Sequence, residues 1–145
     1  MRKSTAVVLL GGYGLFFLGI TLLILPSDHP RPNLVPFRTM RHDWQAGGKH
    51  FVVNFLGNIF AFIPFGVLFP LSRSVPTRLS QAAVACLAFS TIVEALQFLS
   101  GRRVADVDDV LLNTLGGVLG FLLLHALRRW RGNAREIIAV DSPAG

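Results

Sequence analysis

The sequence is poor in charged residues and contains a single cysteine. Charged residues make up 15% of the 145 residues and hydrophobic residues 52%, whereas a soluble domain carries about 25% charge. The chain therefore lacks the polar surface that a soluble domain of useful size would need. The lone cysteine, Cys86, excludes an intramolecular disulfide and any Cys-x-x-Cys metal or redox site. We expect Cys86 to be a buried packing thiol.

What the chain does contain is four long apolar runs. A bilayer core of about 30 Å requires roughly 20 helical residues, and each run comes close to that length. The pattern predicts an all-α, polytopic membrane protein with four transmembrane helices in a small bundle. We expect one membrane domain over 1–131 and a flexible cytoplasmic tail over 132–145. The predicted spans are 5–25, 51–71, 79–99 and 110–127.

The first run resembles a signal peptide in one respect, because Arg2 and Lys3 precede it. The apolar core of a signal peptide is usually about 7–15 residues long and ends at a small-residue cleavage site. Here the run is longer and continues into Leu25-Pro26-Ser27-Asp28 without such a site. We therefore expect an uncleaved first span.

The Lys and Arg residues predict the orientation of these spans. Six of them lie in the connections after the first and third runs, and eight lie at the termini and in the second connection. The positive-inside rule places both termini in the cytoplasm. The net charge of +6 is divided among loops and tails, so it favours a membrane surface as partner and argues against nucleic acid. The eight charges are Arg2, Lys3, Arg73, Arg78, Arg128, Arg129, Arg131 and Arg135.

Amides and carboxylates recur in the outer turns of three runs, whereas the inner halves are almost purely apolar. Ionisable groups inside a membrane are costly and usually functional. Helical spacing places Glu94 and Gln97 on one face and aligns Asp106, Asp109 and Asn113 along another. We predict that these groups form a polar pocket in the outer leaflet. Its expected members are Asn58, Glu94, Gln97, Arg103, Asp106, Asp109 and Asn113.

Some of the neighbouring polar residues have simpler explanations. Asn54 alone is best interpreted as an interhelical hydrogen-bonding residue. Arg102 is expected in a solvated loop, and Asp108 is expected to face water. Glu94 differs, because a buried carboxylate must be protonated, paired or solvated. For Glu94 we favour the polar pocket over an inert ion pair with Arg103.

Other patterns carry less information. The connection 26–50 contains four prolines and is not expected to form a regular helix, and Pro64 predicts a kink in the second span. Glu94, Asp106, Asp109 and Asn113 offer oxygen atoms to a hard cation, but no EF-hand loop is present, and we predict neither a metal nor a cofactor. Gly116 and Gly120 form a small-xxx-small pair that packing explains and that also offers a contact for an oligomer.

These motifs resemble those of the VanZ-like membrane proteins, a family named for an accessory teicoplanin-resistance protein. The resemblance spans Asn33 to Gly120 and begins with Asn33-Leu34-Val35-Pro36-Phe37. Asn58 then opens an Asn-x-x-x-Phe-x-Pro-x-Gly pattern. The third piece is similar to the family's Glu-x-x-Gln, Gly-Arg, Asp-x-x-Asp and Asn-x-x-Gly signature, with either Arg102 or Arg103 as its arginine. That piece consists of Glu94, Gln97, Gly101, Arg102, Arg103, Asp106, Asp109, Asn113, Gly116, Gly117 and Gly120.

The resemblance implies a multi-pass protein of the bacterial cytoplasmic membrane, without an established biochemical activity. Our leading hypothesis is a noncatalytic or weakly catalytic cell-envelope protein that binds a lipid-linked or amphiphilic headgroup in the predicted pocket. The alternative is an intramembrane enzyme on a lipid-linked substrate, with Glu94 or Asp109 as general base and a divalent cation on the Asp pair. A third possibility is a scaffold that tolerates neutralisation of Asp106 and Asp109.

Overall fold

Five helices make up the described part of the chain, and four of them are long and apolar. A computed structural model describes residues 1–23, 32–101 and 104–140. The stretches Lys3–Leu22, Lys49–Ser72, Leu79–Leu99 and Val107–Gly132 are each long and apolar enough to cross a membrane. The predicted all-α architecture with four apolar spans is therefore confirmed. The helices are α1 (Lys3–Leu23), α2 (Arg38–Gln45), α3 (Lys49–Ser72), α4 (Leu79–Leu99) and α5 (Val107–Val140).

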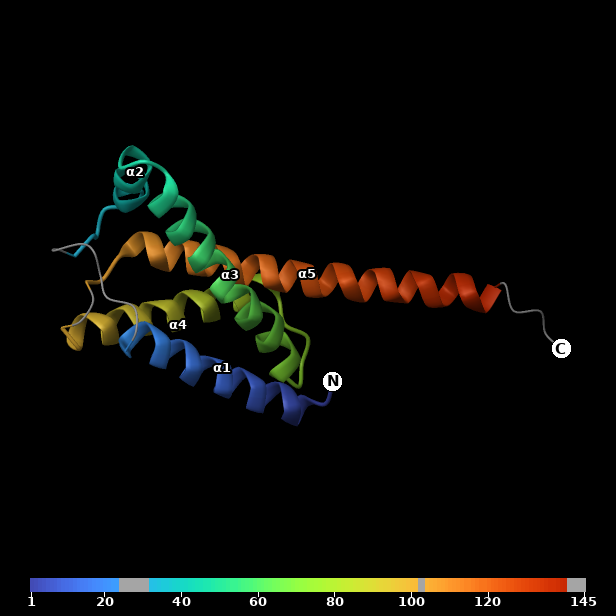
Figure 1. Cartoon of the computed structure of the whole chain (residues 1–145). Helices are drawn as coiled ribbons and strands as arrows, with labels where there is room; N and C mark the ends of the chain where they lie inside the picture. The colour runs from blue at the N-terminus through green and yellow to red at the C-terminus, as the bar shows by residue number, and fades with distance from the viewer. Residues whose placement is uncertain (24–31, 102–103, 141–145) are drawn as a thin grey trace.

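The spans gather beneath α2, which lies at one end of the bundle (Figure 1). α3 packs most extensively against α5 and, to a lesser degree, against α1. The first residues of α1 and the last turns of α5 both lie away from α2 (Figure 1). The start of α1 and the end of α5 are therefore on the same side of the bundle. Which side faces the cytoplasm stays a prediction.

Two features differ from the sequence-based expectations. The connection 26–50, which we expected to lack regular helix, contains α2 over Arg38–Gln45. All four prolines of that connection precede Arg38, so they leave the following eight residues free to form a helix. α5 also runs past the predicted end of the fourth span and continues to Val140, inside the segment that we expected to be a tail.

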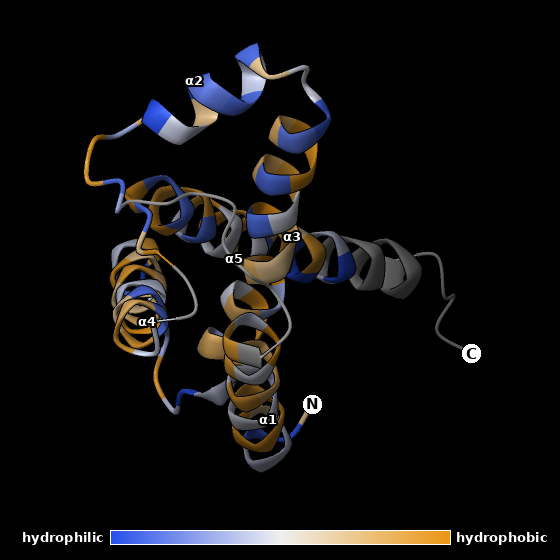
Figure 2. Ribbon diagram, turned by 60° about the vertical axis from the view of Figure 1, so that its left-hand side comes forward, coloured by the Kyte–Doolittle hydropathy of each residue, from blue (hydrophilic) through white to orange (hydrophobic). Residues whose placement is uncertain are grey.

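The outer surfaces of α1, α3 and α4 are largely apolar, whereas α2 is mostly hydrophilic (Figure 2). Large side chains such as Leu15, Phe16 and Phe60 are exposed on these helices. In a membrane these surfaces contact acyl chains, so their exposure is the expected arrangement for spanning helices.

A small aromatic core holds α1, α3 and α4 together. Phe62 on α3 is completely buried, and its ring meets that of Phe17 on α1 edge-on, with the ring centroids 5.2 Å apart. Phe65 stacks on Phe89 of α4 at a centroid distance of 5.0 Å. Cys86 is free and buried within this cluster, which confirms it as a packing thiol. Beside the core, the Tyr13 hydroxyl donates to the carbonyl oxygen of Ala61, in the helical turn before Pro64.

Glycines allow α3 and α5 to approach each other at backbone contact. A Cβ atom on Gly116 would lie 2.1 Å from the carbonyl oxygen of Ile59, and one on Gly120 would lie 2.2 Å from that of Ile63. Both helices advance by four residues between these contacts, so they run in the same direction. The Gly116–Gly120 face, which we considered for an oligomer, is thus occupied by α3 of the same chain.

Candidate functional site

A parallel backbone bridge joins the first connection to the loop before α5. The Asn33 N–H donates to the carbonyl oxygen of Ala105 at 2.9 Å, and the Val107 N–H donates to the carbonyl oxygen of Asn33 at 2.9 Å. The Asn33 side chain is buried and donates through Nδ2 to Asp106 Oδ1 at 2.9 Å and to Thr39 Oγ1 at 3.0 Å. Asn33 therefore fastens two segments that are far apart in the sequence.

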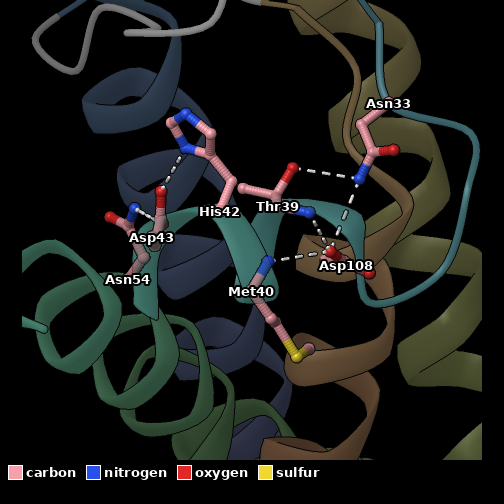
Figure 3. A network of polar contacts seen from close by, with 7 residues as sticks. All are labelled: Asn33, Thr39, Met40, His42, Asp43, Asn54 and Asp108. Carbon is pink, nitrogen blue, oxygen red and sulfur yellow. Dashed lines mark hydrogen bonds and ion pairs between the residues drawn. The ribbon is translucent and has the colours of Figure 1, made fainter. Parts of the chain in front are cut away.

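Asp108 is the residue whose position differs most from expectation. We expected it to face water, but its side chain is only 1% exposed. One carboxylate oxygen, Oδ2, accepts from the N–H groups of Thr39 at 2.9 Å and Met40 at 3.2 Å (Figure 3). The other oxygen, Oδ1, accepts from the N–H of Phe37. Thr39 and Met40 lie in the first turn of α2 and Phe37 is its N-cap residue, so these N–H groups have no acceptor within the helix. Asp108, which lies on α5, thus caps the N-terminus of α2.

This external cap explains the conformation of Phe37. The residue at the N-cap position of α2 has a φ of 66° and provides no side-chain cap. Positive φ is unfavourable for a bulky residue and persists where the surroundings enforce it. The carboxylate of Asp108 accepts a hydrogen bond from the Phe37 N–H and also lies at the positive end of the α2 dipole. Phe37 is the only non-glycine residue with positive φ in the described chain.

Glu94, which lies on α4, accepts a hydrogen bond from the backbone just before α5. Its Oε2 accepts from the backbone N–H of Asp106 at 2.9 Å, and the carboxylate is 6% exposed. Asp106 in turn caps α5, because its Oδ1 accepts from the N–H of Asp108 at 2.8 Å. The buried acid that the sequence singled out therefore supports a helix start rather than standing alone in hydrocarbon.

The other predicted members join pairs of helices nearby. Asn58 on α3 donates to Asp109 Oδ1 on α5 at 2.7 Å. Asn113 on α5 donates to Ser90 Oγ on α4 at 2.9 Å, and Gln97 is 1% exposed on α4. The predicted residues thus lie in successive layers along α4 and α5. Arg103, with Arg102, lies outside the described residues.

We define the polar cluster as the buried or half-buried side chains of these layers. Three of its members, Asn33, Ser90 and Asp108, were not among the predicted pocket residues. Asn33 was noticed only as part of a motif, and Asp108 could be recognised only once α2 was known. The cluster consists of Asn33, Asn58, Ser90, Glu94, Gln97, Asp106, Asp108, Asp109 and Asn113.

α2 closes over one side of the polar cluster. At its C-terminal half, Asp43 Oδ2 accepts from Asn54 Nδ2 of α3 at 2.7 Å, and His42 Nδ1 lies 3.5 Å from Asp43 Oδ1 (Figure 3). Asn54 is thus a hydrogen-bonding residue between helices, as expected, although its partner helix is α2. Gly47 and Gly48, with φ of 119° and 76°, follow α2 and allow the sharp turn into α3.

The space beneath α2 is small. A cavity of about 10 Å³ lies between α2, α3 and α5, roughly the volume that one water molecule requires. One acceptor within the cluster, Asn113 Oδ1, is buried without a hydrogen-bond partner among the described residues. In the same residues, no group of three or more His, Cys, Asp or Glu side chains is arranged to hold a metal ion. The cavity is lined by Thr39, Met40, Asp43, Phe51, Asn54, Phe55, Asp108, Asp109 and Leu112.

Comparisons with known proteins agree with the motifs. The family model described as VanZ/LLP1 matches residues 7–128. The chain is 31% identical over 124 residues to Protein VanZ of Enterococcus faecium, across 85% of this chain and 70% of that protein. No solved structure gives a significant match. The family match extends from the first span into the fourth and includes the whole polar cluster, and the chain therefore belongs to the VanZ/LLP1 family.

Proposed function

We propose that this membrane protein binds the headgroup of an amphiphilic or lipid-linked ligand at the polar cluster, in the outer leaflet of the bacterial cytoplasmic membrane. The observation that carries the proposal is the concentration of four buried or half-buried acids at one end of otherwise apolar spans, namely Glu94, Asp106, Asp108 and Asp109. Ionisable groups within membrane-spanning segments are costly and usually serve a function.

The chemistry of the cluster indicates the kind of headgroup. Its described side chains are rich in oxygen acceptors, and the buried Asn113 Oδ1 has no donor among the described residues. Hydroxyl, amide and ammonium groups are the matching donors. Exposed apolar side chains of α4, such as Leu96 and Phe98, border the same end and would contact an acyl chain. A glycopeptide that carries a fatty chain, such as teicoplanin, has both properties.

On the side that α2 covers, a ligand would reach the cluster by displacing α2. The cavity beneath it is too small for a headgroup, whereas α2 is attached to α3 through Gly47 and Gly48. We therefore propose that the ligand displaces α2 and replaces part of its hydrogen bonding to Asp108 and Asn54. Arg103 stays in the proposal as the residue that would supply positive charge to an acidic group of the ligand.

Replacement of Glu94 by Gln tests the proposal. The change keeps the volume and an acceptor for the Asp106 N–H but removes the charge. We expect the variant to be present in the membrane at the normal level and to lose teicoplanin resistance in a susceptible host. The measurement is the inhibitory concentration together with immunodetection in membrane fractions. Thr91→Val is a matched control, because Thr91 is exposed on α4 and bonds only within its helix. Normal resistance with Glu94→Gln would remove the carboxylate from the proposal.

Direct binding separates this function from a scaffolding role. For the purified protein in nanodiscs, we expect a glycopeptide with a fatty chain to bind at least about tenfold more tightly than the same glycopeptide without it, since each buried CH₂ contributes about 0.8 kcal/mol. Glu94→Gln should weaken the binding of both compounds by about tenfold. Equal affinities for the two compounds, or undetectable binding of either, would contradict the proposal.

A further inference from the structure

α2 has two chemically different faces. Its inner face, with Thr39, Met40 and Asp43, is held by Asp108 and Asn54. On its outer face Arg38, Arg41 and Trp44 follow one another at intervals of three residues, so they form a continuous stripe. All three residues are exposed, and Trp44 is 66% accessible. The stripe is independent of the hydrogen bonds that hold α2 in place.

The two arginines of the stripe have no partner within the described chain. Neither guanidinium forms a hydrogen bond or an ion pair with another described residue. The acids nearest in the fold are directed inwards, since Asp43 on α2 and Asp108 on α5 are 5% and 1% exposed. The positive charge on the outer face of α2 is therefore not neutralised by these carboxylates and is available to an external anion.

Exposed apolar side chains flank these charges. Leu34 and Phe37, just before α2, are 76% and 65% exposed. Trp44 meets Phe51 of the adjoining span edge-on, with the ring centroids 5.4 Å apart. Phe51 lies in the first turn of α3, where that apolar helix begins. Tryptophan at such a position is typical of the headgroup level of a bilayer, which is also the level of the lipid phosphates.

We propose that the outer face of α2 is a binding surface for anionic phospholipid headgroups, with Arg38 and Arg41 contacting the phosphate and Trp44 lying beside it. An arginine pair matches a phosphate by charge and by the geometry of its donors, and the flanking apolar residues match the adjoining acyl region. This surface is distinct from the polar cluster, which offers acceptors and lies on the opposite side of α2.

Trp44 provides the reporter for a test. The chain contains two tryptophans, so Trp130→Phe leaves Trp44 as the only one. The full-length protein is placed in nanodiscs of mixed phosphatidylglycerol and phosphatidylcholine, in which one lipid at a time carries brominated chains that quench tryptophan. We expect brominated phosphatidylglycerol to quench Trp44 several-fold more than the same fraction of brominated phosphatidylcholine. The preference should decline between 0.1 M and 1 M salt, because screening shortens the Debye length from about 10 Å to about 3 Å.

Charge variants test whether Arg38 and Arg41 cause the preference for phosphatidylglycerol. Arg38→Gln with Arg41→Gln should reduce the quenching ratio to about one, and Arg38→Glu with Arg41→Glu should lower it below one. Arg73→Gln with Arg78→Gln is the matched control, because both arginines are exposed at the opposite end of the spans. The control should retain the preference of the parent protein. Thermal unfolding of every variant verifies the fold.

Three outcomes would overturn the proposal. These are equal quenching by the two lipids in the parent protein, an unchanged preference after charge reversal of Arg38 and Arg41, and a loss of preference in the Arg73 and Arg78 control. Because the polar cluster is untouched in all these variants, a failure here leaves the teicoplanin experiments with Glu94→Gln as a separate test.

Discussion

Replacing Asp108 by Ala is expected to release α2 from the bundle. The side chain accepts hydrogen bonds from the N–H groups of Phe37, Thr39 and Met40, and its loss leaves these three groups without that acceptor. A hydrogen bond to a charged group contributes about 1.5–3 kcal/mol, and contributions from one carboxylate are not additive. We therefore expect the free energy for opening α2 to fall by about 3 kcal/mol.

Trypsin detects this opening because Arg38 and Arg41 are cleavage sites on α2 itself. A loss of about 3 kcal/mol corresponds to roughly hundredfold faster cleavage when proteolysis follows the open population. Asp108→Asn should give an intermediate rate, since the amide retains one acceptor oxygen. Asp109→Asn removes the same charge one residue later, where the side chain bonds Asn58 on α3, and should leave cleavage at α2 nearly unchanged. Equal cleavage of the Asp108→Ala and parent proteins would contradict the capping role.

Alanine at Gly116 and Gly120 is expected to separate α3 from α5. Each new Cβ would lie within 2.2 Å of a carbonyl oxygen of α3, and a backbone atom cannot move aside without shifting its helix. Overpacking of this kind costs about 1–3 kcal/mol per site. The double variant thus loses a large part of the 5–15 kcal/mol that stabilises a typical domain. We expect little monodisperse protein after extraction and a clearly lower unfolding temperature.

The matched control for this prediction uses glycines with open surroundings. Gly57 on α3 and Gly12 on α1 have no other group within 4 Å of an added Cβ. Alanine at these two positions should be neutral or slightly stabilising, because it is the better helix former. If the Gly57→Ala and Gly12→Ala protein lost as much stability as the Gly116→Ala and Gly120→Ala protein, close packing of α3 on α5 would not be the cause.

The spans and several polar contacts were predictable because they follow from the cost of polar groups in hydrocarbon. A bilayer permits only long apolar helices, so the four runs, the internal position of Glu94 and the packing role of Cys86 could all be derived from local composition. In the structure Asn58, Glu94 and Asn113 each form a hydrogen bond with a polar group of another segment. The same constraint could not distinguish an open pocket from successive hydrogen-bonded layers, since both satisfy buried polar atoms.

α2 and Asp108 were missed for a shared physical reason. A helix of eight residues is too short to be stable by itself, and α2 has no cap of its own. Its cap comes from a residue 69 positions after Thr39, which no local pattern reveals. Asp108 therefore resembled a solvated loop acid until its partner was known. Asn33 was underestimated in the same way, because its partner Asp106 lies 73 positions later in the sequence.

The bridge between Asn33 and Asp106 has a consequence for how the protein is made. During synthesis, the first connection leaves the ribosome long before Asp106 and Asp108 are added, so neither its backbone pairing nor its cap can form at that stage. α2 therefore stays uncapped until the last span has been inserted. Biogenesis therefore completes this end of the molecule last, and a chain truncated before Asp106 would present an unfinished α2 to membrane quality-control proteases.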